Sequence, residues 1–178
     1  MLISLIGYRG TGKTTVGQLL ADRLGWTCID TDFEVEQQTG VSIKQLFELE
    51  GESGFRDRES EVIRVATRRF KSVLSLGGGA ILRDQNRQAI SVAGPVVWLN
   101  ASAKELYRRI SDDPLSVQQR PNLTSDGGFQ EIQTVLAQRI PIYQACSDCQ
   151  IDTEGKTPRQ ITDEIISKLD LTPQDGIS

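Results

Sequence analysis

The feature that most constrains this chain is the segment GYRGTGKT at residues 7–14, which follows an apolar run at residues 2–6. It matches the phosphate-loop pattern G-x-x-x-x-G-K-[ST], between a predicted buried strand at residues 2–6 and a predicted helix at residues 16–24. In such a loop, glycines without a Cβ let backbone N–H groups turn towards a polyphosphate, and the start of the helix adds its positive end. Lys13 would bridge the β- and γ-phosphates, and the Thr14 hydroxyl would hold Mg²⁺. The alternative, an ordinary glycine-rich turn, fits this strand–loop–helix context poorly.

Size and charge favour one soluble domain that comprises residues 1–178. A chain of 178 residues with 38% hydrophobic and 25% charged residues is long enough for a single α/β core. No apolar run approaches the length of a membrane span, and the N-terminus lacks the pattern of a secretory signal. The formal charge of −4 argues against a general nucleic-acid surface. We therefore expect a cytoplasmic protein with no nucleic-acid or membrane partner.

Histidine is absent, which excludes Ser-His and Cys-His nucleophilic sites and imidazole metal ligands. Catalysis must then rely on carboxylates, Lys, Arg, backbone dipoles and a hard cation. Cys146 and Cys149 form a C-x-x-C pattern, but a tetrahedral zinc site needs four ligands and only Cys28 is left. We expect reduced thiols rather than a zinc site.

Alternation of strand and helix patterns predicts an α/β fold, a five-stranded parallel sheet flanked by helices. The other strands are expected at residues 26–29, 73–76, 95–99 and 150–152. Helices are expected at residues 33–38, from 41 to a break at Gly51 or Gly54, and at 55–70, 83–92, 102–110, 135–143 and 157–169, before a frayed tail at 171–178.

Two acids follow the second predicted strand, in Asp30-Thr31-Asp32. Ligands of open parallel sheets bind at the carboxyl ends of the strands, so both acids point to a binding site. Either acid could instead serve only to cap the next helix. The third predicted strand ends in Gly77-Gly78-Gly79 where many phosphate-loop enzymes carry an Asp, so Asp30 is the candidate acid for the magnesium shell.

Two further features point to a ligand. Arg56 lies in the opening turn of a predicted helix, where a cation opposes the helix dipole; a ligand would explain it, as would solvation or pairing with a Glu. The three consecutive glycines suggest close approach of the backbone to a ligand, or a flexible turn.

Residues 112–128 break all periodicity and contain Pro114, Pro121, Gly127 and Gly128. A loop of this length in a compact domain is typical of a mobile lid. A lid of a phosphoryl-transfer enzyme excludes water and brings a cation to the transferred group, and Arg120 is the candidate for that cation.

Taken together, these motifs resemble shikimate kinase, within the nucleoside-monophosphate-kinase-like group of phosphate-loop proteins (P-loop NTP hydrolase fold). The resemblance covers nearly the whole chain. It rests on GYRGTGKTTVG, IDTD, TGVSIKQLFELEGESGFRDRE, VLSLGGGA, QRPNL, QRIPIY and the IDT of the last strand. The set that joins GE-x-x-FR-x-x-E to LGGGA is far more specific than the phosphate loop alone.

The resemblance implies ATP, Mg²⁺ and shikimate as ligands, in a monomeric kinase that makes shikimate 3-phosphate. ATP would bind Gly10, Thr11, Gly12, Lys13, Thr14 and Thr15, with Arg109 and Lys156 beside adenine and Arg120 at the γ-phosphate. Thr14 and Asp30 would hold the metal, and Lys13, Asp32 and Arg120 would be catalytic. Shikimate would bind Asp32, Arg56, Gly78, Gly79 and Arg139.

Some positions depart from the pattern: Arg9 occupies a variable position of the loop, Asn122 replaces a Leu and Lys156 replaces an Arg. Two alternatives remain at this point. One keeps the fold and changes the acceptor, as in a gluconate or nucleoside monophosphate kinase. The other is a nucleotide-binding regulatory protein without turnover.

Overall fold

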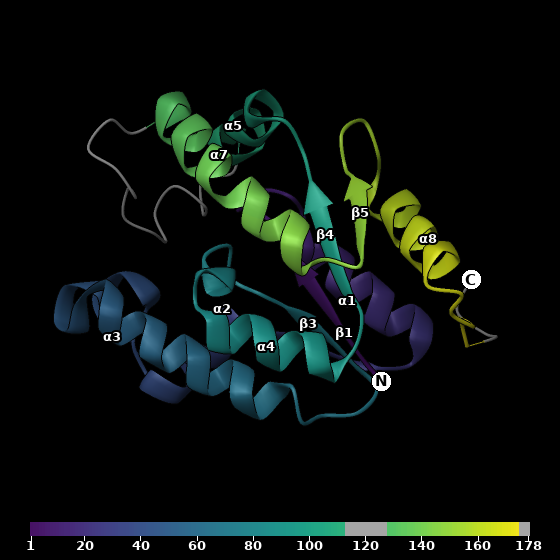
Figure 1. Ribbon diagram of the computed structural model, residues 1–178, viewed down its shortest axis with the longest axis horizontal. Helices are drawn as coiled ribbons and strands as arrows, with labels where there is room; N and C mark the ends of the chain where they lie inside the picture. The colour runs from purple at the N-terminus through teal and green to yellow at the C-terminus, as the bar shows by residue number, and fades with distance from the viewer. Residues whose placement is uncertain (113–127, 175–178) are drawn as a thin grey trace.

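The computed structural model describes residues 1–112 and 128–174. Five strands form one parallel sheet in the order β2-β3-β1-β4-β5 (Figure 1). They are β1 (Leu2–Ile6), β2 (Thr27–Asp30), β3 (Ser72–Ser75), β4 (Val96–Asn100) and β5 (Cys149–Asp152). The predicted five-stranded parallel sheet is confirmed, and each predicted strand overlaps an observed one.

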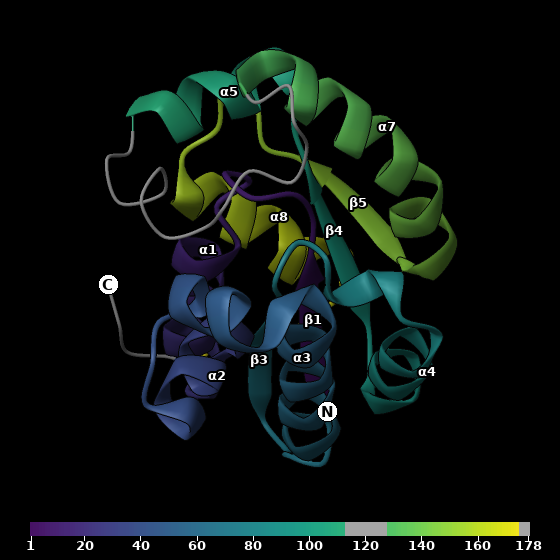
Figure 2. The same cartoon turned by 90° about the vertical axis from the view of Figure 1, so that its left-hand side faces the viewer.

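Helices cover both faces of the sheet (Figures 1 and 2). They are α1 (Lys13–Leu24), α2 (Thr31–Thr39), α3 (Ile43–Ala66), the 3₁₀ turn η1 (Ala80–Leu82), α4 (Asp84–Ala93), α5 (Ala103–Asp112), α7 (Gly128–Cys146) and α8 (Pro158–Lys168). Most predicted helices differ from these only near their ends, where a side-chain pattern carries least information.

Alternation along β1 divides its side chains between two cores. Ile3 and Leu5 belong to a cluster with Leu20 of α1 and Ile165 of α8. Leu2 and Ile6 belong to a cluster that the other face of the sheet forms with α3, α4 and α7. Successive strand residues point to opposite faces, so a strand buried on both faces is apolar throughout. This explains the largely apolar run at residues 2–6, in which the one polar residue, Ser4, is also fully buried.

Helix α3 contains a kink at Gly51, whose φ of 70° and ψ of −177° lie outside the helical range. The sequence predicted a break at either Gly51 or Gly54, and the structure places it at Gly51. The helix begins at a capping box formed by Ser42 and Gln45. It ends at Ala66, four residues before the predicted end.

Helix α7 is longer than the predicted helix at residues 135–143, because it runs from Gly128 to Cys146 and passes through Pro141. A proline within a helix removes one backbone hydrogen bond. Packing offsets this loss: the ring of Tyr143 is fully buried and stacks on Trp98 with 5.7 Å between centroids. The Tyr143 hydroxyl also donates to the Gly78 carbonyl at 2.6 Å. This bond fixes the last turns of α7 to the glycine loop, the Gly77-Gly78-Gly79 segment that follows β3.

The predicted lid at residues 112–128 falls almost entirely outside the described residues. This holds for Arg120 and Asn122, and for the end of the predicted frayed tail. Within residues 1–112 and 128–174, no helix has both the length and the apolar character needed to cross a membrane.

Candidate active site

The phosphate loop connects β1 to α1 at the carboxyl edge of the sheet. Gly12 adopts a left-handed conformation (φ 89°) and forms the N-terminal boundary of α1. The Lys13 ammonium group donates to the carbonyls of Gly7 and Tyr8, both at 2.9 Å. The side chain of Lys13 therefore curls back over the loop, where a bound polyphosphate would meet its charge.

Asp30, at the end of β2, connects three elements of the site. Its Oδ2 accepts hydrogen bonds from the Thr14 hydroxyl at 2.7 Å and the Ser75 hydroxyl at 3.1 Å. Its Oδ1 accepts from the backbone N–H groups of Asp32 at 3.0 Å and Phe33 at 3.4 Å. Asp30 therefore caps α2, as one interpretation of this acid expected, and it also lies beside the phosphate loop; its role in the magnesium shell stays a prediction.

The Thr14 and Asp30 oxygens form a pair that suits Mg²⁺, which prefers hard oxygen ligands and is often held by one or two protein groups plus phosphates. In the described part of the chain, no three His, Cys, Asp or Glu side chains gather as a metal-binding group. The donor set thus fits a magnesium ion that arrives with a nucleotide.

Asp32 lies half-buried in the first turn of α2, two residues beyond Asp30. The backbone N–H of Asp32 is bonded to Asp30, so the positions of the two acids are linked through a single helix start. Their arrangement follows from the sequence Asp-Thr-Asp, because a residue that caps a helix fixes where the next residues begin to turn.

Two buried arginines from different helices meet at the glycine loop that follows β3. Arg56 of α3 and Arg139 of α7 are each only 7% exposed. Arg139 Nη1 donates to the Gly78 carbonyl at 3.1 Å. The Arg56 guanidinium lies so close to Gly79 that a Cβ on that glycine would be 2.6 Å from the Arg56 Cζ. The structure therefore brings together Arg56, Gly78, Gly79 and Arg139, the four residues that the resemblance groups around shikimate; that they bind it stays a prediction.

Arg56 is also paired with acids of its own helix. Its Nη1 donates to Glu59 at 2.7 Å and its Nη2 to Glu52 at 3.5 Å. Its buried Nε finds no hydrogen-bond acceptor among the described residues. The Glu-paired interpretation of Arg56 therefore holds, and the guanidinium still has a donor that a bound anion could use.

Sequence reasoning gave no role to Glu59, although the residue is part of the motif quoted for the family. Its side chain is fully buried against Arg56. The spacing of three residues along one helix was the available signal. Such a pair orients the guanidinium, and removal of one partner would take away its shortest ion pair.

A second part of the site is a pocket of about 340 Å³ between the phosphate loop, α5 and the segment before α8. It is lined by Gly10, Thr11, Gly12, Thr15, Val16, Glu105, Arg108, Arg109, Gly155, Lys156, Pro158 and Ile161. Six of these residues were predicted to bind the nucleotide, and the structure brings all six to one pocket. Glu105, Arg108 and Gly155 were not foreseen.

Arg109 is held firmly at the wall of this pocket. Its guanidinium donates to the Thr153 carbonyl at 2.8 Å, the Thr153 hydroxyl at 3.0 Å and the Gly10 carbonyl at 3.3 Å. Its Nε donates to Glu105 at 2.7 Å. Hydrogen bonds from Arg108 and Arg109 lower the pKa of Glu105 to about 2. Lys156, by contrast, makes an ion pair with Glu164 at 2.6 Å and stays one-third exposed.

Arg9, at the variable position of the loop, forms an ion pair with Glu131 of α7 at 2.9 Å. The Glu131 carboxylate is fully buried, so this contact fastens the phosphate loop to the helix that carries Arg139. The sequence gave no signal for this pair, because its partners are 122 residues apart.

Cys28, Cys146 and Cys149 are half-buried thiols. Burial is the main cause that raises the pKa of each, to about 11 for Cys28. The thiol forms are therefore favoured over the thiolates that metal binding or redox exchange requires.

A phosphate loop after the first strand of a parallel sheet, with an acid from the end of β2 bonded to its threonine, defines an α/β phosphate-loop protein of the nucleotide-binding type. The sequence model of the shikimate kinase family matches residues 9–170. The chain therefore belongs to the shikimate kinase family.

Individual relatives agree with this family. The chain is 41% identical to the shikimate kinase of Rhodopirellula baltica over 162 residues, which cover 91% of this chain and 87% of that protein. It is similar in structure to the shikimate kinase of Acinetobacter baumannii in complex with shikimate, with a TM-score of 0.89, 36% identity, and coverage of 94% and 92% of the two chains. A gluconokinase of Sinorhizobium meliloti shares the fold, with a TM-score of 0.57, 16% identity, and coverage of 94% and 90%.

Proposed function

We propose that this protein is an ATP- and Mg²⁺-dependent kinase that phosphorylates the 3-hydroxyl of shikimate, in the shikimate pathway to chorismate and the aromatic amino acids. The observation that carries the proposal is the meeting of Arg56 and Arg139 at Gly78 and Gly79. Two buried guanidinium groups suit a carboxylated acceptor, because each can bind a carboxylate through charge-assisted hydrogen bonds.

The nucleotide would lie along the phosphate loop, with its phosphates over residues 10–15 and its base in the pocket of about 340 Å³. The side chain of Arg109 would flank adenine with a guanidinium plane that Thr153 already orients. Lys156 offers an ammonium group instead of a plane, so its contact with the base would be weaker.

Thr14 and Asp30 would hold Mg²⁺, with Asp30 acting through water. When bound, the ion neutralises charge on the phosphate oxygens of the nucleotide. Lys13 adds a second positive charge from the protein, and Arg120, which lies outside the described residues, would add a third. Phosphoryl transfer requires positioning and charge neutralisation more than covalent chemistry, so a chain without histidine suffices.

Asp32 would accept a hydrogen bond from the shikimate hydroxyl that is phosphorylated. Its first role is orientation and its second is acceptance of the proton, because a loose transition state releases that proton late and needs no strong base. The backbone N–H groups of Gly78 and Gly79 would lie beside the acceptor. We further propose a cytoplasmic monomer without nucleic-acid or membrane partners; the net charge of −4 argues against a general nucleic-acid surface.

The test is a coupled ADP assay with ATP, Mg²⁺ and a panel of acceptors that includes shikimate and gluconate. We expect Arg139→Ala and Arg56→Lys to raise the KM for shikimate about 10- to 100-fold, because each removes charge-assisted bonds to its carboxylate. The KM for ATP should stay unchanged. Arg58→Ala is the control, since Arg58 lies on the same helix but pairs with Glu50 at the surface.

Preference for gluconate or a nucleoside monophosphate over shikimate would overturn the assignment of the acceptor. Tight ATP binding without transfer to any acceptor would instead favour a regulatory nucleotide-binding protein.

A further inference from the structure

Helix α3 presents two parallel stripes of side chains beyond its kink. Glu52, Arg56 and Glu59 form one stripe, with the spacing i, i+4, i+7 that places residues on one face of a helix. Ser53, Asp57 and Ser60 form the adjacent stripe, each one residue further along the chain. The first stripe carries the arginine proposed to bind the acceptor.

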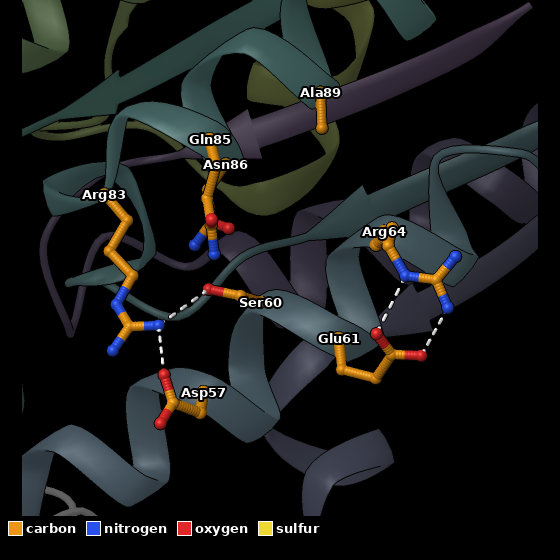
Figure 3. A pocket seen from close by; sticks show the side chains of 8 residues that line it. All are labelled: Asp57, Ser60, Glu61, Arg64, Arg83, Gln85, Asn86 and Ala89. Atoms are coloured by element: carbon orange, nitrogen blue, oxygen red, sulfur yellow. Dashed lines mark hydrogen bonds and ion pairs between the residues drawn. The ribbon is translucent and has the colours of Figure 1, made fainter.

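Arg83 contacts the second stripe at all three positions. Its Nη1 donates to Asp57 Oδ1 at 2.6 Å and to the Ser60 hydroxyl at 3.5 Å, as Figure 3 shows. Its Nη2 donates to the Ser53 carbonyl at 3.3 Å. One guanidinium from outside α3 therefore spans two helical turns that begin two residues after the kink at Gly51.

The segment that carries Arg83 also carries the glycine against which Arg56 packs. Gly79 lies directly before η1, and Arg83 lies directly after it. The Arg83 contacts therefore fix α3 to this segment on one stripe, while Arg56 meets the same segment on the other. Both attachments therefore join α3 to the same short segment.

We propose that Arg83 is a positioning residue for the acceptor: through Asp57, Ser60 and the Ser53 carbonyl it sets where α3 places the Arg56 guanidinium over Gly79. The proposal rests on the proposed function, since Arg56 is taken as a ligand of the acceptor carboxylate. Arg83 itself does not touch the acceptor.

The ion pair of Arg83 with Asp57 is too exposed to contribute much to the stability of the fold, so its role can be tested apart from stability. The side chains of Arg83 and Asp57 are 28% and 68% exposed, and exposed ion pairs contribute little to the free energy of unfolding. The loss of Arg83 should therefore change local placement while the fold persists. A pocket of about 240 Å³ between α3 and α4 leaves room for α3 to shift there.

Arg64 provides a matched control in the same pocket. Its guanidinium binds Glu61 within α3 itself, at 2.5 Å and 2.8 Å (Figure 3). This pair has the same chemistry and a similar setting, but it does not connect α3 to the segment after Gly79.

The experiment compares Arg83→Ala, Arg83→Lys, Asp57→Ala, the double variant and Arg64→Ala. We expect Arg83→Ala to raise the KM and the calorimetric Kd for shikimate about three- to fivefold, with kcat and the KM for ATP unchanged. Arg83→Lys should recover part of the loss, because one ammonium cannot reach all three acceptors. The double variant Arg83→Ala/Asp57→Ala should bind shikimate no more weakly than Arg83→Ala alone, because both changes remove the same contact. Arg64→Ala should have the same KM and Kd for shikimate as the unmodified protein.

An unmodified protein that does not phosphorylate shikimate would refute the proposed function and, with it, this inference. An active protein whose Arg83→Ala variant keeps the shikimate KM and Kd would refute the positioning role alone. A variant with a lower melting temperature and a smaller active fraction, but an unchanged KM and Kd for shikimate, would also refute the positioning role. That result would show that Arg83 serves stability alone.

Discussion

At the scale of single residues, Gly79 has no room for a side chain beside the Arg56 guanidinium. A Cβ at Gly79 would be 2.6 Å from the Arg56 Cζ and 2.8 Å from its Nη1. Carbon atoms do not approach that closely, so any larger residue displaces the guanidinium. The observed position of the Arg56 guanidinium of α3 therefore requires a glycine at residue 79.

We expect Gly79→Ala to raise the KM for shikimate about tenfold or more while the KM for ATP stays the same, because the displaced Arg56 loses charge-assisted bonds to the acceptor. Steady-state kinetics with each substrate varied in turn measure both constants. Gly17→Ala is the control, since its new Cβ would have no neighbour closer than 3.4 Å. Equal shikimate constants in Gly79→Ala and the unmodified protein would contradict the close contact.

The sequence singled out Arg56 as a cation in the first turn of a helix that was predicted to begin at Phe55. That premise was wrong, because α3 begins at Ile43 and Arg56 lies five residues after its kink at Gly51. The sequence did not reveal the burial of Glu59, which depends on how α3 packs in three dimensions. It also did not reveal the bonds from Arg109 to Thr153, whose partners are 44 residues apart. Residue types and short spacings were thus predictable, whereas long-range partners were not.

At the scale of elements, the kink of α3 directs the stripe that carries Arg56. Gly51 has a φ of 70° with a ψ of −177°, a combination that only glycine adopts at low cost. The helix therefore changes direction at one residue, five positions before Arg56.

Gly51→Ala should lower the free energy of unfolding by about 1–3 kcal/mol and raise the KM for shikimate, because relief of the strain redirects the second part of α3. Chemical denaturation and kinetics measure the two effects. Gly40→Ala serves as the control: Gly40 also has a positive φ, of 72°, in open space at the end of α2. A directing role for the kink is contradicted if both variants lower the free energy of unfolding by similar amounts and neither changes the KM for shikimate.

Elements were predicted well where periodicity was strong and less well where packing overrides local preference. The strands came within a few residues of their observed bounds. Helix α7 extends beyond the predicted residues 135–143 at both ends, and its passage through Pro141 depends on the burial of Tyr143. The choice between Gly51 and Gly54 could not be made from sequence, since both residues tolerate a break.

At the scale of the whole molecule, the proposed metal site is completed by the nucleotide. Thr14 and Asp30 supply two oxygens, and the described residues contain no cluster of three metal-binding side chains. Two protein oxygens alone hold Mg²⁺ weakly, because the ion gives up its water reluctantly.

We therefore expect a chelator to abolish phosphoryl transfer while the melting temperature without nucleotide stays unchanged, and added Mg²⁺ to restore activity. Calorimetric titration should detect Mg²⁺ binding only when ATP is present. Asp30→Asn should weaken that binding. Tight Mg²⁺ binding in the absence of ATP would contradict a site that the nucleotide completes.

The class of fold followed from the alternation of strand and helix patterns. The order β2-β3-β1-β4-β5 did not, because it depends on pairings such as Leu2 with Ser72 that are distant along the chain. The contact of Arg9 with Glu131 is hidden for the same reason.

The Gly78 carbonyl accepts two hydrogen bonds, from Arg139 and from the Tyr143 hydroxyl. A peptide unit is planar and trans, so the N–H of Gly79 points away from these two donors. Rotation of that unit would have to break both bonds at once, which makes this rim of the site rigid before any acceptor arrives. The Gly78–Gly79 peptide unit then loses little conformational entropy when the acceptor binds. The entropy lost on binding comes mainly from the side chains that become ordered around the acceptor.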